Sequence, residues 1–96
     1  MEIDVYKRAN VFKALSHPVR LEMVMMLYKT EISVNEIAEK INSLHPELDR
    51  TSISKHLAVL KKHGIVTSRD DGNKKLYTLK AVCLVEVMNC TSNIKH

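Results

Sequence analysis

The spacing of apolar residues predicts two helices in the first part of the chain. The first runs from about residue 4 to 15, with apolar residues at helical intervals on one side. These residues are Val5, Ala9, Phe12 and Leu15. Pro18 suits the first turn of a second helix, where its missing N–H costs nothing. This helix, to about Tyr28, is apolar on most sides, so we expect it to be central and buried.

Capping signals predict two more helices in the middle of the chain. Ser33 and Glu36 have the spacing of a capping box and open a third helix. Residues 42–49 contain a His-Pro pair and read as a loop. Asp49 or Thr51 then caps a fourth helix, whose apolar residues recur at i, i+4 and i+7. This inner stripe consists of Ile53, Leu57 and Leu60.

The second half of the chain changes from helix to strand and back. Gly64 is a natural left-handed stop for the fourth helix. Residues 65–69 and 74–79 are strand-like, and the Asp-Asp-Gly-Asn segment at 70–73 has the chemistry of a turn. Residues 81–94 are apolar enough for a last helix.

This order of elements predicts a mainly α fold with a small β-hairpin, a dimeric winged helix-turn-helix. We expect one domain over residues 1–96, with the helix-turn-helix at about 33–63 and the wing at about 65–79. The terminal helices, about 4–15 and 81–94, would leave apolar patches on a monomer. Pairing them across a two-fold axis would cover these patches, which predicts a homodimer.

The positive charge is concentrated in one part of the chain. The net charge is +4, yet residues 51–80 alone hold seven basic residues against two acidic ones. Such a concentration is the electrostatic footprint that nucleic acid requires. The alternative is an ordinary solvated basic face. Because a polar and basic helix is followed at once by a basic hairpin, we favour double-stranded DNA, with the helix in the major groove and the hairpin along the phosphates.

The residues predicted to contact DNA come from the fourth helix and the hairpin. Hydroxyl, imidazole and basic side chains can bond to base edges or phosphates. On the helix these are Arg50, Thr51, Ser52, Ser54, Lys55, His56, Lys61 and Lys62. On the hairpin they are Arg69, Asn73, Lys74 and Lys75. Asp70 and Asp71 work against phosphate contact, and the hairpin charges could instead protect an edge strand from aggregation.

Three segments resemble one family of regulators. VFKALSHPVRLEM at residues 11–23 resembles a signature of ArsR-type winged-helix repressors. SISKHLAVLKKHGIV at 52–66 is similar to the recognition helix of that family, and residues 69–79 are similar to its wing. The resemblance implies a homodimeric transcriptional repressor that binds an imperfect palindrome and is released by a ligand or a chemical change.

The sensor sites of that family are altered in this sequence. Where metal-sensing members carry two cysteines, EISVN at residues 31–35 has Ser33 and Asn35. Without soft donors, this frame should not hold a thiophilic metal. The Asp and His pairs that other members carry on the last helix are also absent in their usual form, and the loop at 42–49 is longer than the family's usual turn.

Cys83 and Cys90 are the remaining sensor candidates. They lie two helical turns apart, too far for a disulfide within one helix. Across an antiparallel pair of last helices they could approach each other and form a thiol switch or a soft-metal site, with His96 as a further donor. The alternative is that both are small buried hydrophobic residues at the dimer interface.

Other classes of function find little support in the sequence. We expect no enzyme, no cofactor and no membrane partner, because no catalytic set, phosphate loop or membrane span is present. The N-terminus lacks the layout of a signal peptide and the cysteines are few, which predicts a cytoplasmic protein. The second hypothesis for the function is a winged helix that contacts proteins and no DNA.

Overall fold

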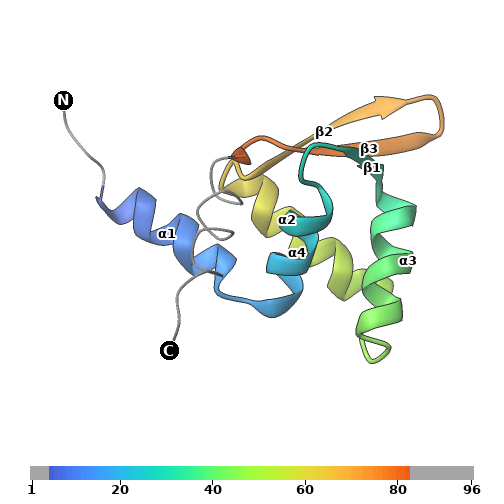
Figure 1. Cartoon of the computed structure of the whole chain (residues 1–96), viewed down its shortest axis with the longest axis horizontal. Coiled ribbons are helices and arrows are strands. Elements are labelled where there is room, and N and C mark those ends of the chain that lie inside the picture. The colour runs from blue at the N-terminus through green and yellow to red at the C-terminus, as the bar shows by residue number, and fades with distance from the viewer. Residues whose placement is uncertain (1–4, 83–96) are drawn as a thin grey trace.

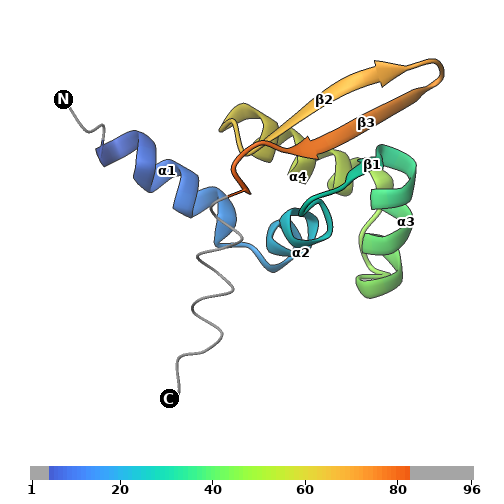
Figure 2. The same cartoon turned by 45° about the horizontal axis from the view of Figure 1, so that its top comes forward.

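The computed structural model describes residues 5–82, which form four helices and a three-stranded sheet (Figure 1). Helix α2 lies centrally, α3 and α4 pack beside it, and the β2–β3 hairpin projects at the end opposite α1 (Figures 1 and 2). The elements are α1 (Val5–Leu15), α2 (Pro18–Met26), β1 (Glu31–Ser33), α3 (Val34–Leu44), α4 (Arg50–Lys62), β2 (Val66–Asp71) and β3 (Lys74–Leu79).

Side-chain caps fix the starts of α3 and α4. The Oγ of Ser33 accepts a hydrogen bond from the Glu36 N–H at 3.2 Å, as the capping box predicts. Asp49 caps α4, since its Oδ1 accepts from the Ser52 N–H at 2.7 Å. This hydrogen bond stabilises the carboxylate and lowers the pKa of Asp49. Of the two capping residues that the sequence allowed, the structure uses Asp49.

The end of α4 is closed by a left-handed glycine. Gly64 has a φ of +71°, and its N–H donates to the Lys61 carbonyl at 3.1 Å. The next N–H, of Ile65, donates to the Leu60 carbonyl at 3.0 Å. These two bonds make a Schellman motif, which satisfies carbonyls that the helix leaves free and turns the chain into β2.

The core is aliphatic and joins all of the helices to the sheet. The predicted inner stripe of α4 is buried, with Ile53, Leu57 and Leu60 each 2% exposed or less. The other side chains that are almost fully enclosed are Met23, Val24, Leu27, Ile37, Ile41, Ile65 and Val66. Helix α4 is therefore held by its apolar side, and its opposite side is free to meet a partner.

The sheet contains a strand that the sequence did not predict. Residues 31–33 form β1, which pairs antiparallel with β3, so the strand order is β1-β3-β2. Glu31 lies opposite Thr78, and Ser33 lies opposite Leu76. Because Ser33 is both the last residue of β1 and the cap of α3, the sheet is joined directly to the helix-turn-helix.

Two predicted boundaries were wrong. Strand β2 extends through Asp71, so the hairpin loop is only Gly72 and Asn73 rather than residues 70–73. Gly72 has a φ of +64°, which a two-residue hairpin loop with glycine at its first position accommodates. Helix α3 continues to Leu44, so the connection to α4 is shorter than the predicted loop at 42–49. The predicted mainly helical fold with a wing is confirmed, while the last predicted helix, 81–94, lies almost entirely outside the described residues.

Candidate nucleic-acid interface

The exposed face of α4 is polar, basic and free of carboxylates. Thr51, Lys55 and Lys62 recur at helical spacing on this face, with the small Ala58 between the two lysines. Ser54 is exposed beside them. No Asp or Glu occurs within Arg50–Lys62. The helix itself thus presents a narrow cationic surface, and the one acidic group established at its start is the cap Asp49, whose carboxylate interacts with Lys55.

The first turn of α4 is tied to α3. The Nη2 of Arg50 donates a hydrogen bond to the Oδ1 of Asn35, which bridges the two helices of the helix-turn-helix. Ser52 is half-buried next to its cap. Asn35 and Ser33 occupy the positions where the resemblance places metal-binding cysteines. Here they serve instead as a bridge between helices and as a helix cap.

His56 lies on a different flank of α4 from Lys55. Its ring is half-buried, and its Nδ1 accepts a hydrogen bond from the Nε of Arg20 in α2 at 3.2 Å. Its centroid lies 4.4 Å from that of the His17 ring. Burial is the main cause that lowers the pKa of His56, with smaller effects from the nearby His17 and Arg20. The structure therefore engages His56 with α2, whereas Lys55 is exposed.

Lys61 is also engaged within the protein. Its Nζ donates to the Oγ of Ser68 in β2 at 2.8 Å. The bond fastens the last turn of α4 to the wing, although the side chain stays at the surface. Because an ammonium group has three donors, Lys61 can keep this bond and still meet a phosphate.

The tip of the wing carries balanced charges. Asn73, Lys74 and Lys75, which the sequence analysis named as candidate DNA contacts, are all exposed. In the register of the hairpin, Lys74 lies opposite Asp71 and Lys75 lies opposite Asp70. Opposite charges in facing positions stabilise a two-stranded ribbon. The same acids reduce the positive potential at the tip, so the wing offers a weaker attraction for DNA than its lysines alone would suggest.

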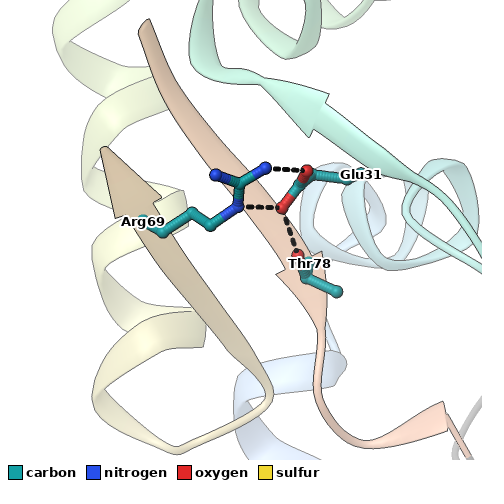
Figure 3. Close-up of polar contacts among 3 residues, drawn as sticks. All are labelled: Glu31, Arg69 and Thr78. Atoms are coloured by element: carbon teal, nitrogen blue, oxygen red, sulfur yellow. Dashed lines mark hydrogen bonds and ion pairs between the residues drawn. The ribbon is translucent and has the colours of Figure 1, made fainter. Parts of the chain in front are cut away.

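Arg69 makes the most extensive polar contact of the sheet (Figure 3). Its Nε and Nη2 donate to the two carboxylate oxygens of Glu31 at 2.9 and 2.8 Å, so the pair is bidentate. The Thr78 hydroxyl donates to the same carboxylate at 3.2 Å. The contact runs from β2 across β3 to β1. We call Glu31, Arg69 and Thr78 the wing clamp.

The wing clamp changes the role expected of Arg69. The hydrogen bonds from Arg69 are the first cause of the lowered pKa of Glu31, which keeps this carboxylate ionised. Arg69 alternates along β2 with Ser68, and Ser68 is the residue that faces α4 through Lys61. Arg69 therefore lies on the sheet face directed away from α4. Sequence reasoning missed Glu31 and Thr78 because β1 was not predicted.

We expect Glu31→Gln to lower the thermal midpoint of unfolding at pH 7 and low salt, because the amide cannot form the ionic pair with Arg69. The folded pKa of Glu31 is lowered, so its stabilisation is present above the pKa in the unfolded chain and is lost as the pH falls through the folded value. The difference from wild type should shrink below about pH 4 and in about 1 M salt.

Thermal melts at two salt concentrations and several pH values test this prediction. Glu39→Gln is the matched control, because it removes the same charge from an exposed glutamate of α3 outside the clamp. Equal midpoints for Glu31→Gln and Glu39→Gln at pH 7 would contradict a stabilising clamp.

The predicted sensor residues Cys83, Cys90 and His96 lie outside the described residues. Within residues 5–82, no group of three or more His, Cys, Asp or Glu side chains is arranged to hold a metal ion. Over the same range, no helix has the length and apolar character to cross a membrane.

Comparison with known families and proteins identifies relatives of this arrangement. A family model described as a helix-turn-helix domain matches residues 15–69. The biofilm growth-associated repressor of Xylella fastidiosa is 35% identical over 94 residues, covering 98% of this chain and 78% of the repressor. The transcriptional activator HlyU of Vibrio cholerae is 29% identical, covering 97% of this chain and 87% of HlyU.

Solved structures share the fold. The structure of HlyU from Vibrio cholerae superposes with a TM-score of 0.78 at 29% identity, covering 94% of this chain and 96% of that one. The structure of the transcriptional repressor BigR from Xylella fastidiosa has a TM-score of 0.77 at 30% identity, covering 95% of this chain and 90% of that one.

Proposed function

The chain belongs to the helix-turn-helix domain family of transcriptional regulators, and we propose from this that it binds double-stranded DNA and regulates transcription. The observation that carries the proposal is the exposed face of α4, which is basic, has no acidic residue within Arg50–Lys62 and is held in place by the buried opposite face. A helix of this kind fits the major groove of a duplex. The family and the relatives are regulators rather than enzymes.

In the proposed complex, the first half of α4 reads base edges and the rest of the site meets phosphates. Thr51, Ser54 and Lys55 are exposed near the start of the helix, where residues of a recognition helix reach the groove floor. Lys61 and Lys62, at the other end of α4, would lie near the backbone. On the wing, Asn73, Lys74 and Lys75 would contact the flanking strand, with an attraction reduced by the two aspartates.

We infer smaller roles for the remaining predicted residues. Arg50 and Ser52 would set the position of the first turn of α4 on the duplex, since their bonds to Asn35 and Asp49 hold that turn in place. Arg69 has N–H groups beyond those bound to Glu31, so it can support a phosphate contact while the wing clamp stays closed.

We propose a homodimer, because α1 exposes its apolar stripe. Val5 is 67% exposed, Tyr6 85% and Phe12 62%, whereas Ala14 and Leu15 at the end of the helix are buried. A second copy of the chain would cover this stripe by two-fold symmetry. A symmetric dimer presents two α4 helices, and it would therefore bind an imperfect palindrome. This is also the assembly that the sequence resemblance implies.

Regulation by repression is our proposal for the outcome of binding. The Xylella fastidiosa relative is named a repressor, whereas the Vibrio cholerae relative is named an activator. A cytoplasmic location and release by a signal belong to the same proposal. A thiol or soft-metal sensor built from Cys83 and Cys90 stays a prediction from the sequence.

Binding to duplex DNA at increasing salt tests the proposed function. Duplexes selected from a random pool by the protein should bind tightly at about 0.1 M salt. Their affinity should fall linearly on a logarithmic plot, with a slope of about 0.9 for each phosphate contacted. The competing hypothesis, a winged helix that contacts only proteins, predicts weak association that salt does not change. That result would overturn our proposal.

A further inference from the structure

A chain of hydrogen bonds connects the end of α1 to the middle of α4. The Nη1 of Arg20 donates to the carbonyl of Ala14 at 3.2 Å, and the Nε of the same guanidinium donates to His56 Nδ1 at 3.2 Å. One side chain of α2 thus bridges the helix proposed for the dimer interface and the helix proposed to read DNA. All of these groups are part-buried, so water competes poorly for the bonds.

His17 completes this cluster beside His56. The two rings are tilted by 48° with their centroids 4.4 Å apart. The Nδ1 of His17 accepts a hydrogen bond from the Val19 N–H at 3.2 Å, which caps α2. Each imidazole therefore uses Nδ1 as an acceptor, and in neutral histidine this places the proton on Nε2. The hydrogen bond from Arg20 is therefore compatible only with a neutral His56 ring.

The surroundings of His56 provide no charge that would favour an imidazolium. The titratable or charged groups that face it are His17 and Arg20, and α1 contributes only the carbonyl of Ala14. Within residues 5–82, no hydrogen bond or ion pair brings a carboxylate to either ring or to Arg20. The pKa of His56 is accordingly lowered, first by burial and then by His17 and Arg20.

Protonation of His56 would remove the bond to Arg20. An imidazolium carries a proton on Nδ1, so two donors would face each other where a donor now meets an acceptor. The added charge would also lie beside the Arg20 guanidinium in a partly desolvated space. The ring must then turn or move away from α2. Because His56 is part of α4, loss of this bond removes a contact that holds α4 to α2 at the residue next to Lys55.

We propose that His56 is a positioning residue: in its neutral form it fixes α4 through Arg20 in the orientation that a duplex requires, and acidification releases α4 and weakens DNA binding. The inference rests on the proposed function. The direction of the pH effect on affinity is diagnostic, because added positive charge on a protein would by itself strengthen binding to a polyanion. A loss of affinity at low pH therefore requires a change in geometry.

The test compares the affinity for a selected duplex at pH 7.5 and at one pH unit below the titration midpoint of the His56 ring, which NMR measures, at constant ionic strength. For the wild type, we expect about a tenfold loss for each pH unit below the His56 pKa, since only the fraction with neutral His56 is competent to bind. In His56→Asn, the amide oxygen can accept from Arg20 and does not titrate. The ratio of the two affinities should therefore be close to one, whatever the affinity at pH 7.5.

His45→Asn is the matched control, because it makes the same substitution at a histidine of the α3–α4 connection, outside the cluster. This control should keep the pH ratio of the wild type. If His56→Asn fails to fold, His56→Gln replaces it, with folding checked by circular dichroism. Equal pH ratios in the wild type and the folded position-56 variant would overturn the inference.

NMR on the full chain without DNA separates this inference from the proposed function. The backbone amide signals of α4 should shift with the same midpoint as the His56 ring. If these signals do not shift, the proposed release of α4 is disproved, even if the protein binds DNA. If the wild type binds no duplex at pH 7.5, the proposed function and the DNA step of the inference are both wrong.

Discussion

Lys55→Ala is expected to reduce the affinity for a selected duplex by about 5- to 150-fold for each half-site that loses the contact, corresponding to about 1–3 kcal/mol. Lys55 is exposed in the first half of α4, on the face that carries Thr51 and Ser54. At this position a lysine can reach the edge of a base, so its loss should also relax the sequence preference at one position. Competition binding with a panel of single-base variants measures both effects.

Lys62→Ala should behave differently, although it removes the same charge from the same face. Lys62 lies at the last turn of α4, where we expect contact with phosphate. Its loss should weaken binding to all duplexes about equally and reduce the salt slope by about one. The charge-matched control is Lys13→Ala on α1, a helix that lies at the opposite end of the molecule from the hairpin tip (Figure 1). Equal effects of Lys55→Ala and Lys13→Ala would contradict the proposed docking of α4.

The helical part of the fold could be predicted because its signals are local. The stripe of Ile53, Leu57 and Leu60 is visible within eight residues and is buried as the periodicity requires. The caps and stops act within one turn of the helix that they close, as Ser33 and Gly64 do. Such features need no knowledge of the rest of the chain.

The features that the sequence did not reveal depend on contacts between distant residues. Strand β1 has three residues, too few for an alternating pattern, and its partner β3 lies far along the chain. Arg69 and Glu31 are 38 positions apart, and Arg20 and His56 are 36 apart. From the sequence alone, a basic or polar side chain could contact DNA or bond to another residue of the protein. Only the tertiary structure shows which partner it has.

The extended β2 strand shows how cross-strand pairing can override a turn signal. Asp70 and Asp71 favour turns by composition, yet each faces a lysine across the hairpin. This pairing keeps both aspartates within the strand and leaves a two-residue loop. The wing keeps its predicted extent, but its strands continue closer to the tip, and the two aspartates there reduce the positive potential. We therefore place the main electrostatic contribution to DNA binding on α4.

Leu57→Ala is expected to cost about 2–5 kcal/mol of unfolding free energy, because it removes a side chain from the centre of the core and leaves a cavity. Leu57 is 1% exposed and lies on the inner stripe that fixes α4 against the rest of the fold. For a domain of this size, the loss is a large part of the total stability, about 5–15 kcal/mol. Urea unfolding at a fixed protein concentration measures it, since a dimer unfolds in a concentration-dependent manner.

Two variants make this result specific to packing. Leu57→Met nearly conserves the volume and should cost less than about 1.5 kcal/mol. Ser54→Ala, on the exposed face of the same helix, should change stability by no more than about 0.5 kcal/mol while still weakening DNA binding. Substitutions on the buried face of α4 would thus change the free energy of unfolding, and substitutions on its exposed face would change the affinity for DNA. If Leu57→Ala unfolds at the same urea concentration as Ser54→Ala, then α4 is not anchored by its buried stripe, and a rigid recognition helix loses its physical basis.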